Sequence, residues 1–120
     1  MKVADRADLG VTVVALTGEL ALDSAPMLRA VFADLVDRGV SRIVLDASGL
    51  QFCDSVGLSV LVTSHTACRA RDGFVRVAGP SDALMRLLTV VGLTEHLQAF
   101  RTVAAAAAAD ARERVDPVRA

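Results

Sequence analysis

The sequence predicts an α/β fold, in which one small domain is built on a mixed, mostly parallel sheet of about four or five strands with three or four helices. Short runs rich in β-branched residues alternate along the chain with amphipathic stretches of roughly 10 to 17 residues, the order of βαβ units. Crossover connections of this kind place consecutive strands parallel. The length of 120 residues is that of one ordinary domain.

The first elements of the chain are expected to be two strands and a helix. Residues 2–7 are weakly patterned and fit an edge strand, whereas Val11 to Thr17 is rich in β-branched residues and fits a strand inside the sheet. Ser24 precedes an apolar stripe at helical spacing and is a candidate N-cap. Arg38-Gly39 marks the end of this helix, because glycine readily adopts the left-handed conformation that closes a last turn.

The middle of the chain predicts a strand, a helix and another strand. The first strand spans Arg42 to Asp46, and its apolar run Ile43 to Leu45 belongs at the centre of the sheet. After a loop, a helix is expected from Ser55 to about Arg71, with Ser55 as its N-cap. Asp72-Gly73 stops this helix, and Phe74 to Ala78 forms the next strand.

The last part of the chain predicts a third helix and a short final strand. Ser81 is a good N-cap for a helix that ends at Gly92-Leu93 in a Schellman motif. Leu97 to Arg101 fits a last short strand.

The C-terminal segment differs in composition from the rest of the chain. We expect a domain over residues 1–102 and an alanine-rich helix and tail over residues 103–120. Residues 103–109 are all small or apolar, which predicts a surface helix that frays, and the chain is expected to be disordered from Asp116.

Composition excludes several classes of function. The net charge of −1 and the 22% of charged residues give no electrostatic basis for binding nucleic acid or an anionic membrane. Aromatic residues make up only 3%, which argues against a stacking platform for single strands. No segment approaches the roughly 20 apolar residues of a membrane span, and the N-terminal residues Met1 to Arg6 contain no apolar stretch of the kind found in a signal peptide. We therefore expect a cytoplasmic protein.

The residues do not predict an enzyme, a metal site or a cofactor. Cys53 and Cys68 lack CxxC spacing and are expected as buried thiols. His65 and His96 have no obvious carboxylate partner and are interpreted as structural. Neither a nucleophile with a base nor a glycine-rich phosphate loop is present, so no catalytic residue is assigned.

Three stretches of the chain carry a recognisable motif. Residues 45–58 read Leu-Asp-x-Ser-Gly-Leu-x-Phe-x-Asp-Ser-x-Gly-Leu, residues 18–20 read Gly-Glu-Leu before Ser24-Ala25-Pro26-x-Leu28-Arg29, and residues 84–93 read Leu-x-x-Leu-Leu-x-x-x-Gly-Leu. This pattern, over roughly Val11 to Phe100, resembles the STAS domain of bacterial anti-sigma factor antagonists.

The resemblance implies a regulatory cycle. In that family the unphosphorylated protein binds an anti-sigma factor with a histidine-kinase-like ATPase fold and so releases the sigma factor. The anti-sigma factor is also a serine kinase that phosphorylates the serine after the aspartate, here Ser55, and a serine phosphatase reverses this. The expected partner-binding residues are Asp23, Ser24, Asp54, Ser55, Val56, Gly57 and Ser59. Ala21 stands where many members carry aspartate, and Asp23 is the candidate substitute.

Other readings of the sequence stay open. A STAS domain can also serve in a stressosome or beside a membrane transporter. The alternation of strands and helices alone also permits a flavodoxin-like domain, and a small nucleotide-binding α/β module is a further alternative, against which the missing phosphate loop counts. For the switch itself, a phosphate would bring about −1.5 to −2 charges to Ser55.

Overall fold

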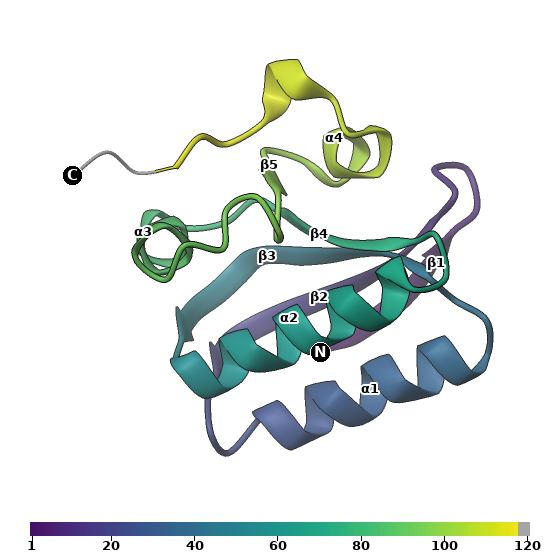
Figure 1. Cartoon of the computed structure of the whole chain (residues 1–120), viewed down its shortest axis with the longest axis horizontal. Coiled ribbons are helices and arrows are strands. Elements are labelled where there is room, and N and C mark those ends of the chain that lie inside the picture. The colour runs from purple at the N-terminus through teal and green to yellow at the C-terminus, as the bar shows by residue number, and fades with distance from the viewer. Residues whose placement is uncertain (118–120) are drawn as a thin grey trace.

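A five-stranded mixed sheet, with strands in the same order as in the chain, organises the computed structural model, which describes residues 1–117 (Figure 1). The first strand pairs antiparallel with the second, and all other pairs are parallel. The predicted fold class is therefore confirmed. The strands are β1 (Lys2–Arg6), β2 (Val11–Leu20), β3 (Arg42–Cys53), β4 (Phe74–Ala78) and β5 (Ala99–Phe100). The helices are α1 (Ala25–Asp37), α2 (Ser55–Arg69), α3 (Asp82–Val90) and α4 (Val103–Ala108), with a 3-10 turn at Ala111–Glu113.

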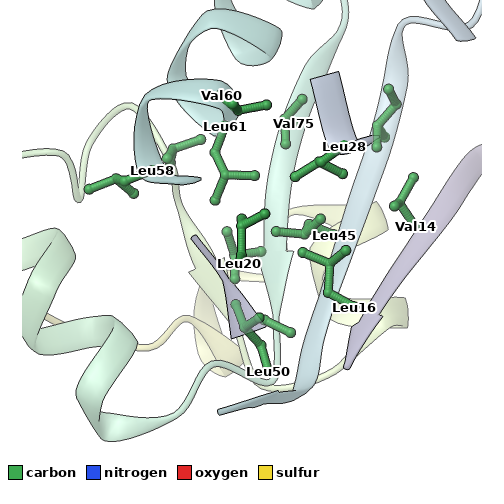
Figure 2. Close-up of a cluster of buried hydrophobic side chains, with 14 of the residues drawn as sticks. Val14, Leu16, Leu20, Leu28, Leu45, Leu50, Leu58, Val60, Leu61 and Val75 are labelled. Atoms are coloured by element: carbon green, nitrogen blue, oxygen red, sulfur yellow. The ribbon is translucent and has the colours of Figure 1, made fainter. Parts of the chain in front are cut away.

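Helices cover both faces of the sheet, so the core has two parts. In Figure 1, α1 and α2 lie side by side on one face and α4 lies on the other. The alternation in β2 serves both, because Val14 and Leu16 belong to the larger cluster while Val11 and Val13 belong to the smaller one. Figure 2 shows the larger cluster, in which side chains from α1 and α2 meet those of β2, β3 and β4.

Strand β3 is much longer than predicted, because it continues from Asp46 to Cys53 through residues that we expected to form a loop. Two shifts in register against β2 occur in this part, each with an extra residue on β3. Such β-bulges bend a strand without ending it. At Gly49 a side chain would come within 2.9 Å of Thr17 Cγ2, so the glycine permits close pairing here instead of marking a turn.

The helix ends were predicted with mixed success. Ser81 accepts a hydrogen bond from the Leu84 amide (3.1 Å), and the amide of Leu93 donates to the Leu88 carbonyl (2.9 Å) as a Schellman motif requires. Ser24 is wrong as a side-chain cap, because its hydroxyl makes no capping bond to α1.

Helix α4 is not the fraying surface helix that the sequence suggested. Ala105, Ala106 and Ala107 are buried against the sheet, and the Thr102 hydroxyl caps the helix by accepting from the Ala105 amide (3.1 Å). Small side chains let this short helix approach the sheet closely. The sequence analysis missed this because a buried helix face is usually recognised by larger apolar residues. The predicted disorder from Asp116 falls largely on residues 118–120, which lie outside the described residues.

Candidate functional site

The candidate site lies at the carboxyl ends of the parallel strands β2 and β3. The amide of Asp54 donates to the carbonyl of Leu20 (3.1 Å), so the two strand ends are joined directly. The chain then enters α2 after β3 and the loop 21–24 after β2. In open α/β sheets, binding sites usually form at the carboxyl ends of the strands.

Asp54, and not Ser55, is the N-cap of α2. Its Oδ1 accepts a hydrogen bond from the Gly57 amide (2.8 Å). Its Oδ2 accepts from the Leu22 amide (3.2 Å), which belongs to the other loop. One carboxylate therefore fixes the start of α2 and ties it to residues 21–24. Aspartate and serine are nearly equal as caps, so neighbouring Asp54 and Ser55 could not be separated by type alone.

Ser55 is the first residue of α2 and is exposed at the predicted position. Within residues 1–117 its hydroxyl has no hydrogen-bond partner, and the amides of Ser55 and Val56 have no acceptor. First-turn amides of a helix are left free by the helix itself and favour a negative charge. The hydroxyl is thus accessible for modification, and a phosphate there would lie beside free donors.

Gly57 has a steric role. A Cβ atom at this position would lie 2.6 Å from the Leu20 carbonyl oxygen and 2.7 Å from Leu20 Cγ. Glycine therefore lets the first turn of α2 sit directly on the end of β2. Gly57 is buried, whereas Val56 is half-buried and Ser59 is exposed, with its hydroxyl donating to the Val56 carbonyl (2.8 Å).

The loop from β2 to α1 is held by Ser24. Its hydroxyl accepts from the Ala21 amide (2.9 Å) and lies 3.0 Å from the Glu19 carbonyl, to which it donates. Asp23 is exposed and forms no hydrogen bond or ion pair within the described residues. The structure thus brings Ser24, Asp54 and Ser55 together at the carboxyl ends of β2 and β3. Asp23 lies in the same loop as Ser24 but forms no bond with these residues.

Three large apolar side chains near the carboxyl ends of β2 and β3 are exposed, and the sequence analysis did not identify them as candidate binding residues. Leu22 is 67% exposed, Met27 is 64% exposed and Phe52 is 52% exposed. Leu22 and Phe52 lie on either side of Asp54. The backbone amide of Leu22 donates the hydrogen bond to Asp54 described above, and Phe52 lies two residues before Asp54 along the chain, in β3. Met27 was visible in the sequence as an apolar residue outside the predicted stripe of α1. Exposed apolar side chains gathered near one site are a feature of protein interfaces.

The half-buried thiol of Cys53 lies beside the site. Burial raises the pKa of Cys53 to about 11, and the carboxylate of Asp54 adds to this effect. The thiol therefore stays protonated near neutral pH. Cys68 is buried, as expected. Among residues 1–117, no group of three or more acidic, histidine or cysteine side chains is arranged to hold a metal ion. No helix in this part of the chain is long and apolar enough to cross a membrane.

The chain is similar to known proteins in sequence and in fold. The model of the STAS domain matches residues 2–106. An anti-sigma F factor antagonist of Paenibacillus polymyxa is 33% identical over 85 residues, which are 70% of this chain and 73% of that protein. An anti-sigma-B factor antagonist of Bacillus subtilis (strain 168) is 31% identical over 83 residues, which are 68% of this chain and 74% of that protein. The crystal structure of an anti-sigma factor antagonist from Mycobacterium paratuberculosis is 29% identical with a TM-score of 0.76, and the match covers 90% of each chain.

A mixed five-stranded sheet with helices on both faces and an exposed serine at the start of α2 defines a small α/β domain. The chain belongs to the STAS domain family. Its relatives named above are anti-sigma factor antagonists, so the family resemblance predicted from the motifs is confirmed.

Proposed function

We propose that this protein is an anti-sigma factor antagonist that acts in the cytoplasm. Its unphosphorylated form binds an anti-sigma factor with a histidine-kinase-like ATPase fold, and the sigma factor is released. The same partner, as a serine kinase, phosphorylates Ser55 and ends the interaction, and a serine phosphatase restores it. The relatives' names support antagonism, and the observation that carries the switch is the exposed, unbonded Ser55 hydroxyl on the first residue of α2.

The surface around Ser55 suits binding to another protein. Leu22, Met27 and Phe52 supply apolar area, and the loop 21–24 is fixed before any partner arrives, because its amides donate hydrogen bonds to Ser24 and Asp54. A surface ordered in advance loses less conformational entropy on binding. The partner-binding residues proposed on this surface are Asp23, Ser24, Asp54, Ser55, Val56, Gly57 and Ser59, with buried Gly57 acting through the packing of α2.

A phosphate on Ser55 would affect the partner more than the fold. The free amides of the first turn favour an anion there, so α2 has no reason to unfold. In an interface, a dianion without a matching cation costs several kcal/mol, and about 4 kcal/mol is nearly a thousandfold in affinity. Binding would be lost while the domain stays folded.

The test combines capture with a charge series. The protein is used as bait in extract of its own host, and any retained ATPase-fold kinase is identified, purified and titrated by calorimetry. Ser55→Ala should bind as the unmodified chain does and resist phosphorylation, whereas Ser55→Glu should bind more weakly. Thr63→Glu, which adds the same charge further along α2, is the matched control and should bind normally.

Two results would refute the proposal. The first is tight binding by Ser55→Glu, because charge at this position would then not control the interface. The second is phosphate mapped to Ser48 or Ser59 with Ser55 unmodified after incubation with the kinase and ATP.

A further inference from the structure

A hollow of about 450 Å³ lies at the free edge of β4, far along α2 from Ser55. It exists because β5 pairs with β4 only at Val77 and Ala78, so among the described residues the first half of β4 has no strand on that side. The polar side chains that line the hollow come from α2, from β4 and from the segment before β5. They are His65, Arg69, Arg76, Glu95, His96 and Gln98.

His65 takes the place of the missing strand. Its Nδ1 accepts a hydrogen bond from the Val75 amide (3.0 Å), which would otherwise be an unpaired donor at the edge of the sheet. Because Nδ1 is the acceptor, the ring proton belongs to Nε2, which has no acceptor within residues 1–117. The half-buried imidazole is thereby oriented and keeps one donor for something else.

Arg76 is also held in place before any ligand is present. Its guanidinium lies 3.5 Å from the centre of the Phe74 ring, and its Nη1 donates to the Ala106 carbonyl (3.0 Å) at the end of α4. A second guanidinium, that of Arg42, lies 5.2 Å from the same ring. Stacking and capping use one face and one nitrogen of Arg76, so the other donors of the fork remain available.

The positive charges here have no acidic partner. Among the described residues neither Arg69 nor Arg76 forms an ion pair, and the one carboxylate in the lining, Glu95, is exposed and pairs with Arg114 (3.3 Å). Burial lowers the pKa of the Arg76 guanidinium, and its neighbours Arg42 and Arg69 lower it further. Cations that repel one another across a hollow are stabilised by an anion that enters it.

We propose that this hollow binds a small phosphorylated molecule, with its phosphate dianion between Arg69 and Arg76 and within reach of the Nε2 donor of His65. Two unpaired guanidinium forks match a dianion in charge and in hydrogen-bond geometry, while a single carboxylate would satisfy only one of them. The volume is in the range of small-molecule sites. The site is separate from Ser55 and does not depend on the proposed function.

The test is a titration of the isotope-labelled full chain by NMR with inorganic phosphate and with glucose 6-phosphate, and with acetate and sodium chloride at equal ionic strength as comparisons. Both phosphate probes should shift the amides of Val75 and Gln98 saturably. Arg69 is exposed, and its side chain forms no hydrogen bond or ion pair within residues 1–117, so Arg69→Gln should remain folded and bind roughly tenfold more weakly or worse. Arg86→Gln removes the same charge from an exposed position on α3 and should bind normally.

The outcomes are distinguishable. Absence of saturation at millimolar phosphate, or an equal loss in Arg69→Gln and Arg86→Gln, would overturn the site. Saturation by acetate at the same concentration as phosphate would overturn the assignment to phosphorylated ligands.

Discussion

Replacing Asp54 tests how one carboxylate holds two segments together. Asp54→Ala removes the cap of α2 and the bond to the Leu22 amide at once. Loss of a cap costs about 1 kcal/mol and loss of a hydrogen bond to a backbone amide costs about another 1 kcal/mol. We expect a total of about 2 kcal/mol, which lowers the ratio of folded to unfolded protein roughly thirtyfold.

Asp54→Asn separates the two bonds. Asparagine caps a helix nearly as well as aspartate, and its single amide oxygen can accept from Gly57. Its NH2 group cannot accept from Leu22. The expected loss is therefore about 1 kcal/mol, half that of Asp54→Ala. Asp23→Asn is the matched control, because Asp23 lies in the adjoining loop without a bond in the described structure, and it should leave stability unchanged.

Urea unfolding followed by far-ultraviolet circular dichroism measures these losses, since the chain has no tryptophan or tyrosine to report by fluorescence. With a slope of about 2 kcal/mol per molar, the midpoint should fall by about 1 M for Asp54→Ala and about half as much for Asp54→Asn. Equal midpoints for Asp54→Ala and the unmodified chain would refute the structural role of this carboxylate. Equal losses in the two variants would show that the bond to Leu22 does not act separately from the cap.

Three further predictions follow from single contacts. Gly57→Ala should destabilise by about 1 to 3 kcal/mol in urea unfolding, because its Cβ would press on the Leu20 carbonyl, and any gain in stability from better helix propensity would contradict this. Burial lowers the pKa of His65, and the nearby charge of Arg69 lowers it further. As the pH falls, this histidine is therefore protonated in the unfolded chain before it is protonated in the folded one. The free energy of unfolding should then decrease as the pH drops below about 6.5. His65→Asn keeps an acceptor for the Val75 amide and should lose less stability between pH 7.5 and pH 5.5 than the unmodified chain. An equal loss in both proteins would contradict the assignment of this pH dependence to His65. Ser55→Ala should unfold at the same urea concentration as the unmodified chain, because Ser55 is not the cap, and a clear drop would show otherwise.

Local chemistry made several elements predictable. Strand β4 has the predicted bounds, since five largely apolar residues lie between two glycine-containing breaks. Helix α3 has the predicted cap and Schellman motif, because both are formed by neighbouring residues. Ser55 was found at the start of α2 from the motif and the helical spacing together.

Other features depend on residues far apart in the chain and were not predictable. The extension of β3 requires Gly49 to approach β2, and nothing in the local sequence distinguishes that from a turn. The bond from Leu22 to Asp54 joins residues on two different loops. The hydrogen bond from the Val75 amide to His65 at the edge of β4 is equally non-local, so the sequence did not reveal the partner of this histidine.

The order of the sheet has a consequence for synthesis on the ribosome. Because β1 to β5 pair in the order in which they are translated, each strand emerges next to an edge that is already formed, and none must insert between two others. Residues 113–115 then lie along the outer side of β5, where the Arg101 amide donates to the Glu113 carbonyl and the Val115 amide donates to the Ala99 carbonyl. A nascent chain can therefore build this sheet from one side to the other by adding each new strand at one growing edge.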